Sequence, residues 1–386
     1  MVAPKLRSGQ SAYPGTFVGP AEDPERYQLL ELLHGPTHPL LKEDEDASVW
    51  KCKETSTGTL RAVKIFSAAC SIGPGPEVVV HRLWAINGHF GYQPKGTPPR
   101  LSPHPGGQAT SLDVGPYGDA ATAFELHGAT LAQWQAERPT PSLPLILAKR
   151  IICQLLLAID YIHTGIPDYH FIHGGISLND VLLDKPFSEQ ELAEDQPAEA
   201  LCIKLCGFTY SKGFGGSGGY FPYPDPATAA PEQFMLDDGY TGNGEGPPID
   251  VWAVGVVLSR LLFDQVQPFD KKDVRYENDD PVEEIRAYRL PRNLLIALAS
   301  INSQEEWPEM FSDETSNNHE ASFPFNIPGV EPMPSLRERV ETEGKIDDPA
   351  ELDKLVSFLS ACWTLDWSKR PTAKELLHYE WLEGFE

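Results

Sequence analysis

The segment FIHGGISLNDVLL, residues 171–183, places an imidazole and a carboxylate on one short loop between apolar stretches. His173 lies near its start and Asp180 lies near its end. A carboxylate in such a loop either binds a metal ion or caps a turn. Gly174 and Gly175 follow the histidine and contribute no side chain. The loop therefore has polar groups at both ends and no group for proton transfer between the histidine and Ile176.

An ammonium group stands at Lys64 in the strand-like run LRAVKIF, residues 60–66. A lysine on a strand usually faces solvent, and the alternative is that this one binds an anion. The run EVVVHRLW begins at Glu77 and predicts a short helix.

The elements that must position these groups are predicted from hydrophobic periodicity. Residues 144–163 have apolar side chains at three- and four-residue spacing after Pro144, which predicts a long helix leading into loop 171–183. The predicted strands span residues 27–33, 47–53, 60–66, 109–114, 120–126 and 201–205, and the further helices span 131–136, 249–263, 352–362 and 372–382.

Three other segments carry weaker signals. Residues 1–24 are rich in Pro and Gly, and we expect a loosely docked arm there. Residues 184–200 form an acidic insertion that predicts an exposed loop. Residues 281–288 predict a short helix that starts at a proline.

The acidic balance of the chain limits its partners. It has 56 Asp and Glu residues against 31 Lys and Arg residues, a formal net charge of −25. This charge argues against nucleic acid or an anionic membrane as the partner, and it fits either a basic polypeptide or simple solubility. The six cysteines form no CxxC pair, so free thiols in a reducing compartment are predicted.

No apolar run approaches the ~20 residues that a membrane helix needs. The first residues, MVAPKLRSGQ, lack the apolar core of a secretory signal. We therefore expect a protein of the cytoplasm or the nucleus.

Seven short motifs occur in the order that they have in eukaryotic protein kinases: AVK, FELHG, IHGG, KLCGF, APE, DVWAVG and DWSKRPTAKELLHYEWL. The set most resembles the SR-protein-kinase-like group, notably in LDVGPYGDAATAFELHG. The resemblance covers about residues 27–382 and implies a bilobal α+β fold with a small antiparallel-sheet lobe, a larger helical lobe and a nucleotide cleft between them. It divides the chain into an arm at 1–26, an N-lobe at 27–126 and a C-lobe at 127–386.

The resemblance assigns roles to residues that this chain retains. Lys64 would hold the α- and β-phosphates of ATP and would pair with Glu77. Glu125 and His127 would lie in the hinge between the lobes, where backbone groups meet the adenine. His173 would be a packed structural residue rather than a base.

Four further residues match structural positions of the family. Phe208 would be the apolar anchor of the D-F-G motif. Glu232 of the A-P-E motif would pair with Arg370. Asp250 would hold the backbone of loop 171–183.

The residues that carry the family's chemistry are replaced. Gly175 stands in place of the catalytic Asp, and Gly207 stands in place of the magnesium-binding Asp of D-F-G. Ser177 replaces the loop Lys, and Asp180 replaces the metal-binding Asn. ATP is still an expected ligand, whereas the magnesium site would retain only Asp180 as a candidate metal ligand.

The glycine-rich loop that covers the phosphates in kinases is also degenerate. The corresponding segment HGPTHPLLKEDED keeps only Gly35, and Pro36 and Pro39 remove backbone donors. Its acidic end, residues 43–46, would place carboxylates near the phosphates.

These observations leave three hypotheses. The first is a pseudokinase, a kinase-shaped binding, scaffolding or regulatory protein with weak or no phosphoryl transfer. The second is an active serine/threonine kinase of the SR-protein-kinase-like group with unusual metal ligation. The third is an unrelated α+β protein with chance motif matches. For the partner we expect a basic polypeptide, such as an Arg/Ser-rich one, on the acidic large lobe.

Overall fold

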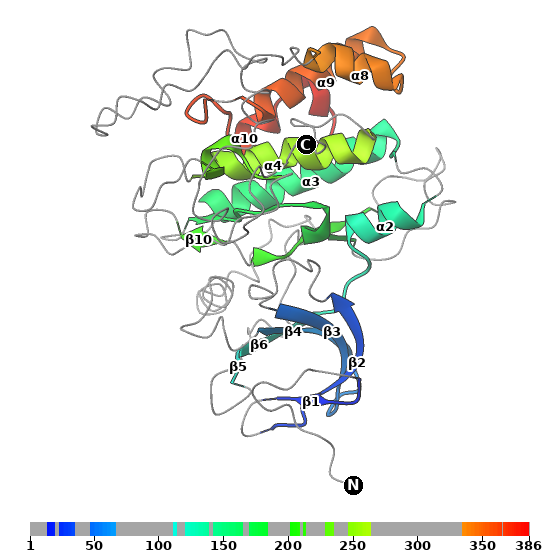
Figure 1. Ribbon diagram of the computed structural model, residues 1–386, viewed down its shortest axis with the longest axis vertical. Helices are drawn as coiled ribbons and strands as arrows, with labels where there is room; N and C mark the ends of the chain where they lie inside the picture. The colour runs from blue at the N-terminus through cyan, green and yellow to red at the C-terminus, as the bar shows by residue number, and fades with distance from the viewer. Residues whose placement is uncertain are drawn as a thin grey trace, which may run out of the picture.

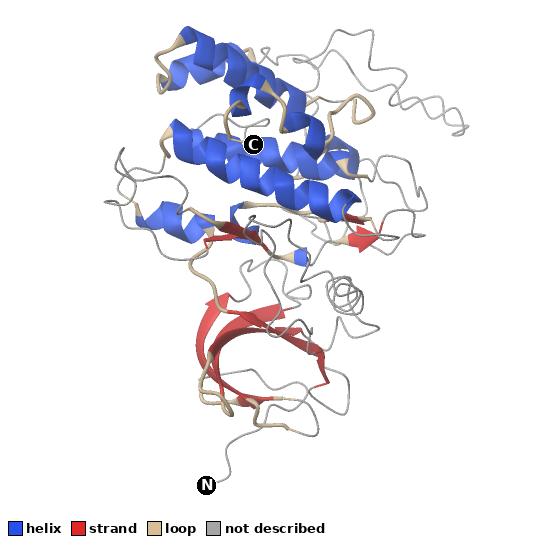
Figure 2. Cartoon of the chain, turned by 180° about the vertical axis from the view of Figure 1, so that it is seen from behind, coloured by secondary structure: helices blue, strands red, loops and turns tan. Residues whose placement is uncertain are grey.

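The computed structural model describes residues 14–19, 23–34, 47–66, 111–113, 120–138, 142–164, 170–183, 201–208, 211–213, 228–234, 246–263, 334–364 and 366–385. Figure 1 shows two lobes, one built from a curved sheet and one built mainly from helices. Figure 2 shows the same division from behind, with the long helices stacked at one end and the large sheet at the other. This is the bilobal α+β arrangement that the sequence predicts.

The sheet lobe contains a six-stranded antiparallel sheet in the order β1-β2-β3-β4-β6-β5. Its strands are β1 (Phe17–Val18), β2 (Tyr27–His34), β3 (Ala47–Glu54), β4 (Leu60–Phe66), β5 (Ser111–Asp113) and β6 (Ala120–Glu125). Side chains alternate between the two faces of a strand. Val63 and Ile65 are therefore buried in the core of this lobe, while Lys64 lies on the other face and is partly buried.

The N-terminal arm is not loosely docked along its whole length, and that expectation is wrong for β1. This strand pairs with the start of β2, and Val18 is fully buried. The amide of Gly15 donates to the carbonyl of Leu29 at 2.8 Å, and the amide of Leu29 donates to the carbonyl of Thr16 at 2.8 Å. The edge of β2 would otherwise expose unpaired backbone groups, which explains why the arm joins the sheet there.

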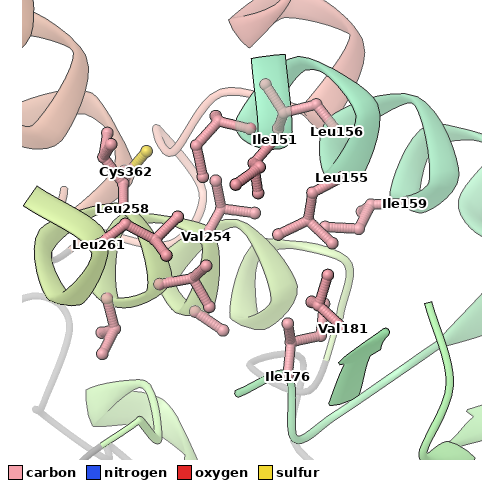
Figure 3. Close-up of a cluster of buried hydrophobic side chains, with 14 of the residues drawn as sticks. Ile151, Leu155, Leu156, Ile159, Ile176, Val181, Val254, Leu258, Leu261 and Cys362 are labelled. Atoms are coloured by element: carbon pink, nitrogen blue, oxygen red, sulfur yellow. The ribbon is translucent and has the colours of Figure 1, made fainter. Parts of the chain in front are cut away.

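The helical lobe is organised around α3 (Leu145–Thr164) and α4 (Pro248–Leu262), which pack against each other. Figure 3 shows apolar side chains of both helices meeting in one cluster. The labelled members are Ile151, Leu155, Leu156, Ile159, Ile176, Val181, Val254, Leu258, Leu261 and Cys362. Because Ile176 and Val181 belong to loop 171–183, the central helices anchor that loop directly.

Shorter elements complete this lobe. They are α2 (Leu131–Glu137), β7 (Phe171–Ile172), η4 (Leu178–Asp180), β8 (Val181–Leu183), β9 (Ile203–Leu205), β10 (Lys212–Gly213), η8 (Pro231–Phe234), α8 (Leu336–Glu343), α9 (Pro349–Cys362), α10 (Ala373–Leu376) and η10 (Glu380–Leu382). Helix α9 packs on α4, and α10 packs on α3. Strand β7 pairs with β10 and β8 pairs with β9, so two small ladders flank the loop.

The helix predicted over residues 372–382 is wrong in its extent. Helix α10 ends at Leu376, and a turn separates it from the 3-10 helix η10. Trp381 and Leu382 are fully buried, and the Trp381 ring lies 4.9 Å from that of Phe358 on α9. The chain changes direction here because both side chains must reach this core.

Helix α8 was not predicted as an element of its own. Val340 is its only buried residue, so the segment has no apolar period to detect. Its signal is instead the capping box in which Ser335 and Glu338 bond to each other's backbone.

The other predicted helices and strands are present, with ends shifted by up to about three residues, except the short helix predicted from Glu77, which lies outside the described residues. The insertion at 184–200 and the helix at 281–288 lie outside the described residues. None of the five cysteines in the described ranges forms a disulfide. Within the same ranges, no helix is both long enough and apolar enough to cross a membrane.

Candidate functional site

The backbone of loop 171–183 is held by the buried carboxylate of Asp250. Asp250 on α4 accepts hydrogen bonds from the backbone amides of His173 and Gly174, each at 2.8 Å. Its Oδ2 also lies 2.8 Å from Nε2 of His163 at the end of α3. A carboxylate only accepts hydrogen bonds, so this imidazole nitrogen carries the proton. The contact between Asp250 and the loop backbone is the one expected from the sequence.

The charge of Asp250 is stabilised in spite of its burial. Burial alone would raise its pKa. The hydrogen bond and charge of His163, together with the charge and amide of His173, outweigh burial and hold the pKa of Asp250 below its ordinary value. The loop amides therefore donate to an ionised carboxylate, that of Asp250.

Backbone carbonyl groups of the loop also accept hydrogen bonds. The hydroxyl of Ser211 donates to the carbonyl of His173 at 3.3 Å, and the amide group of Gln233 donates to the carbonyl of Gly174 at 3.0 Å. Gly174 has a φ of 81°, in the left-handed region that favours glycine. Backbone contacts therefore maintain the loop without any side chain at positions 174 and 175.

His173 is a packed residue, consistent with its expected structural role. Its side chain is buried, its Nε2 lies 2.8 Å from the carbonyl of Cys206, and its ring lies 4.9 Å from that of Phe208. Phe208 is also buried. The two rings connect loop 171–183 to the segment that contains Gly207.

Asp180 caps the turn η4, which is one of the two roles that the sequence leaves open. Its Oδ2 accepts from the hydroxyl of Ser177 at 2.6 Å and from the amide of Ser177 at 2.9 Å. The same hydroxyl accepts from the amide of Asn179 at 3.2 Å. Ser177 therefore fixes the carboxylate of Asp180.

Because Gly207 has no side chain, the carboxylate of Asp180 can lie next to it. A Cβ atom at position 207 would lie 1.9 Å from Oδ1 of Asp180 and 2.9 Å from its Cγ, far inside contact distance. Gly207 also has a φ of 78°, which favours glycine. With this backbone, there is room for the carboxylate of Asp180 but not for a side chain at position 207 as well.

Lys64 on the sheet lobe interacts electrostatically with Asp180. It lies in the interior of the sheet, opposite Val49 on β3 and Thr122 on β6. Burial raises the pKa of Asp180, and the charges of His173 and Lys64 and the hydrogen bonds from Ser177 oppose this rise without cancelling it. Asp180 is thus an acid within electrostatic range of Lys64.

The described residues do not fit the magnesium site that two aspartates and an asparagine would form. Gly175 and Gly207 supply no side-chain oxygen, and one oxygen of Asp180 already accepts two hydrogen bonds. No group of three or more His, Cys, Asp or Glu side chains gathers as a metal site in the described ranges. Mg²⁺ prefers near-octahedral oxygen ligation, and this site offers one free carboxylate oxygen.

Three further residues were predicted to belong to the site: Glu125, His127 and Glu77. Glu125 ends β6 opposite Arg61 and is exposed, whereas His127 is partly buried. The following segment is fixed to β8, because the amide of Gly128 donates to the carbonyl of Leu183 at 2.8 Å. Glu77 lies outside the described residues, so its pairing with Lys64 stays a prediction.

The expected pair between Glu232 and Arg370 is present. The guanidinium donates to both carboxylate oxygens, at 2.6 and 3.1 Å, and also to the carbonyl of Pro248 at 2.7 Å. It lies 5.1 Å from the Trp252 ring centroid. Both partners are buried, so this pair joins η8, α4 and the turn before α10 in the interior.

Sequence reasoning missed two features of the site. One is His163, whose position at the end of an amphipathic helix gave no hint of its contact with Asp250. The other is the shared space of Asp180 and Gly207. Its signal was present in the sequence, since an acid at one position coincides with a glycine at the other.

The family model for the protein kinase domain matches residues 125–382, more than half of the chain. The chain therefore belongs to the protein kinase domain family. The match begins at the last residue of β6 and continues through η10. Together with the curved antiparallel sheet that precedes it, the matched region forms the bilobal protein kinase fold.

Replacing Glu232 with Ala should destabilise the protein by about 3–5 kcal/mol, because Arg370 would remain as a buried, uncompensated charge. Chemical denaturation measures this change. Adding Arg370→Met should recover part of the loss. The matched control is Glu341→Ala, which breaks an exposed pair with Arg337 and should leave stability nearly unchanged. Equal effects of the two single substitutions would contradict this prediction.

Asp180→Asn should stabilise the protein at neutral pH. The folded state raises the pKa of Asp180, so its ionisation costs stability as the pH rises through that pKa. The gain should shrink as the pH falls toward the unfolded pKa of about 3.9. Urea unfolding at several pH values measures it.

Asp366 provides the matched control for this experiment. It caps a turn by accepting from the amide and hydroxyl of Ser368, and its pKa is lowered despite an opposing effect of burial. Asp366→Asn should therefore destabilise the protein at neutral pH. The same sign for both variants would contradict the assignment.

Proposed function

We propose that this chain is a pseudokinase, a binding, scaffolding or regulatory protein that retains the kinase fold with weak or no phosphoryl transfer. The observation that carries the proposal is the position of Asp180. Its carboxylate is fixed by Ser177 and occupies the space at Gly207 where a magnesium-binding side chain would begin.

The energetics of phosphoryl transfer support this proposal. The reaction depends on positioning and on neutralising the developing charge, and the protein supplies carboxylates for both purposes. Loss of one acid–base group typically costs ~10²–10⁴ in rate. Gly175 lacks the acid–base carboxylate and Gly207 lacks the metal-binding one, and effects within one site do not simply multiply.

The hydrogen bonds that hold loop 171–183 also support the proposal. The bonds from Asp250, Ser211 and Gln233 maintain the loop by backbone atoms alone. The fold can therefore persist after the catalytic side chain is lost. Such a fold still offers surfaces for protein partners.

One observation favours the alternative of an active serine/threonine kinase. Asp180 lies within electrostatic range of Lys64, so one acid and one ammonium remain near the place where a nucleotide would bind. A place in the SR-protein-kinase-like group is proposed for either reading, and ATP is a proposed ligand in both. The group assignment is supported by the motifs of the sequence.

For the partner we propose a basic, Arg/Ser-rich polypeptide that docks on the acidic helical lobe. The net charge of −25 supports this choice. The surface around α8 and α9 contributes to it, with exposed Glu338, Asp347 and Asp348.

Phosphate transfer from labelled ATP to an Arg/Ser-rich peptide tests the main proposal. We expect no transfer above that of Lys64→Ala. Transfer by the wild type that is lost in Lys64→Ala would refute the proposal. The double variant Gly175→Asp/Gly207→Asp should also remain inactive, because the new side chain at position 207 meets Oδ1 of Asp180. An active kinase assayed on the same peptide is the positive control.

Binding of an Arg/Ser-rich peptide should weaken steeply as salt rises, because exposed charges separated by more than about 8 Å are largely screened at physiological ionic strength. Fluorescence anisotropy over a salt series measures this. A peptide with Lys and Arg replaced by Gln is the control. Binding that salt leaves unchanged would contradict the charge-based choice of partner.

A further inference from the structure

We propose that a cavity in the helical lobe binds a short peptide segment in which one bulky apolar side chain stands beside one carboxylate. The cavity has a volume of about 420 Å³ and lies where α2 and α4 end, where α3 begins and where the turn between α8 and α9 passes. Ligand pockets typically have volumes of about 300–1,000 Å³. This binding site is separate from the acidic surface around α8 and α9, and it rests on the proposed function of a binding protein.

Hydrogen bonds between the elements that meet at the cavity hold its walls. The amide of Leu143 donates to the carbonyl of Leu261 at 2.8 Å. The side-chain amide of Gln135 on α2 donates to the carbonyl of Arg260 at 2.7 Å. These bonds tie α2 and the segment before α3 to the C-terminal end of α4, where carbonyl groups have no partner within the helix. The cavity is therefore formed before a ligand arrives, which lowers the entropic cost of binding.

Most of the lining of the cavity is apolar. Leu143, Leu262 and Phe263 line it and are at most 6% exposed. The partly buried Leu145 and Ile346 continue this surface. Because the fold already buries much of it, the remaining surface suits one apolar side chain of a ligand rather than a large ligand. Burial of that side chain would supply most of the binding free energy.

The polar part of the lining carries positive charge. Arg138, Ser142 and Lys345 contribute to it, and none of the described residues that line the cavity is acidic. The ammonium of Lys345 donates to Oγ of Ser142 at 2.6 Å, which keeps it at the cavity. The carboxylate of Glu343 lies 3.5 Å from the same ammonium and offsets part of its charge. With Arg138 as a second cation, the cavity complements one carboxylate.

The surroundings limit the ligand to one acidic group. Asp347 and Asp348 follow Ile346 and are exposed, and the whole chain has a net charge of −25. These charges would repel a run of acidic residues, whereas a single carboxylate can pair with Lys345 or Arg138. One side chain and one exposed ion pair do not outweigh the entropic cost of association by a wide margin. A peptide adds contacts outside the cavity, so we assign the two groups to a peptide rather than to a free small molecule.

The test uses the full chain and a short amidated probe, Gly-Ser-Glu-Phe-Ser-Gly, capped with a trifluoroacetyl group for titration by fluorine NMR. We expect the probe to bind. Replacing its Glu with Gln should raise the Kd about threefold, the size of an exposed ion pair. Replacing its Phe with Ala should raise the Kd about tenfold or more, because the apolar burial is lost.

Variants of the protein locate the binding site. Lys345→Gln should remove the difference between the Glu and Gln probes, and Lys345→Arg should retain it. The matched control is Lys369→Gln, which removes an exposed ammonium that pairs with Asp366 at 3.1 Å and should leave the difference unchanged. Leu145→Trp should fill the cavity and abolish binding of both probes. Thermal unfolding verifies that each variant is folded.

Several results would overturn the proposal. They are no binding of the Glu probe, equal affinity for the Glu and Gln probes, tighter binding of a probe with Lys in place of Glu, and equal effects of Lys345→Gln and Lys369→Gln. Binding of phenylpropionate as tight as that of the probe would show a site for a free small molecule instead of a peptide. The transfer assay on the Arg/Ser-rich peptide decides the proposed function separately, since none of these titrations measures phosphate transfer.

Discussion

The hydrogen bonds from two loop amides to the buried Asp250 carboxylate are the contact on which the rest of the site depends. They act on backbone atoms, so they are indifferent to the side chains that the loop carries. Because His163 and His173 keep Asp250 ionised, the contact persists in an interior that would otherwise favour the neutral acid. The loop conformation and the chemistry of the loop are thus separate properties of this fold.

The same separation appears at the Glu232–Arg370 pair. Its bonds to a carboxylate and to the carbonyl of Pro248, together with the contact with Trp252, join segments far apart in the sequence. None of these groups belongs to the cleft. These contacts do not depend on the side chains at positions 175 and 207. A family match over residues 125–382 is therefore compatible with glycine at both positions.

Most of the fold could be predicted from the sequence because its elements have strong local periods. The apolar spacing of α3 and the alternation of β4 each describe one buried face, and both elements are present as expected. Helix α8 has a single buried residue and gave no such signal. The end of α10 depends on the packing of Trp381 against Phe358. This is a tertiary contact, which a local sequence pattern does not reveal.

The site was predictable in part for a similar reason. Motif order located Asp250, Glu232 and Arg370, since each has a family position. The relation between Asp180 and Gly207 could not be found this way, because 27 positions separate them and only the fold brings them within contact distance. In the structure, the carboxylate of Asp180 occupies space next to Gly207 that a side chain at position 207 would need.

The short strand β1 has a practical consequence for anyone who prepares fragments of this protein. A fragment trimmed to begin at Tyr27, where the strong strand pattern starts, would remove β1, one of the two neighbours of β2. It would open the edge of β2 at Tyr27 and Gln28, close to Leu30, whose side chain is already 38% exposed. Open edges with apolar side chains recruit further chains, so such a fragment would self-associate for reasons unrelated to the native assembly state.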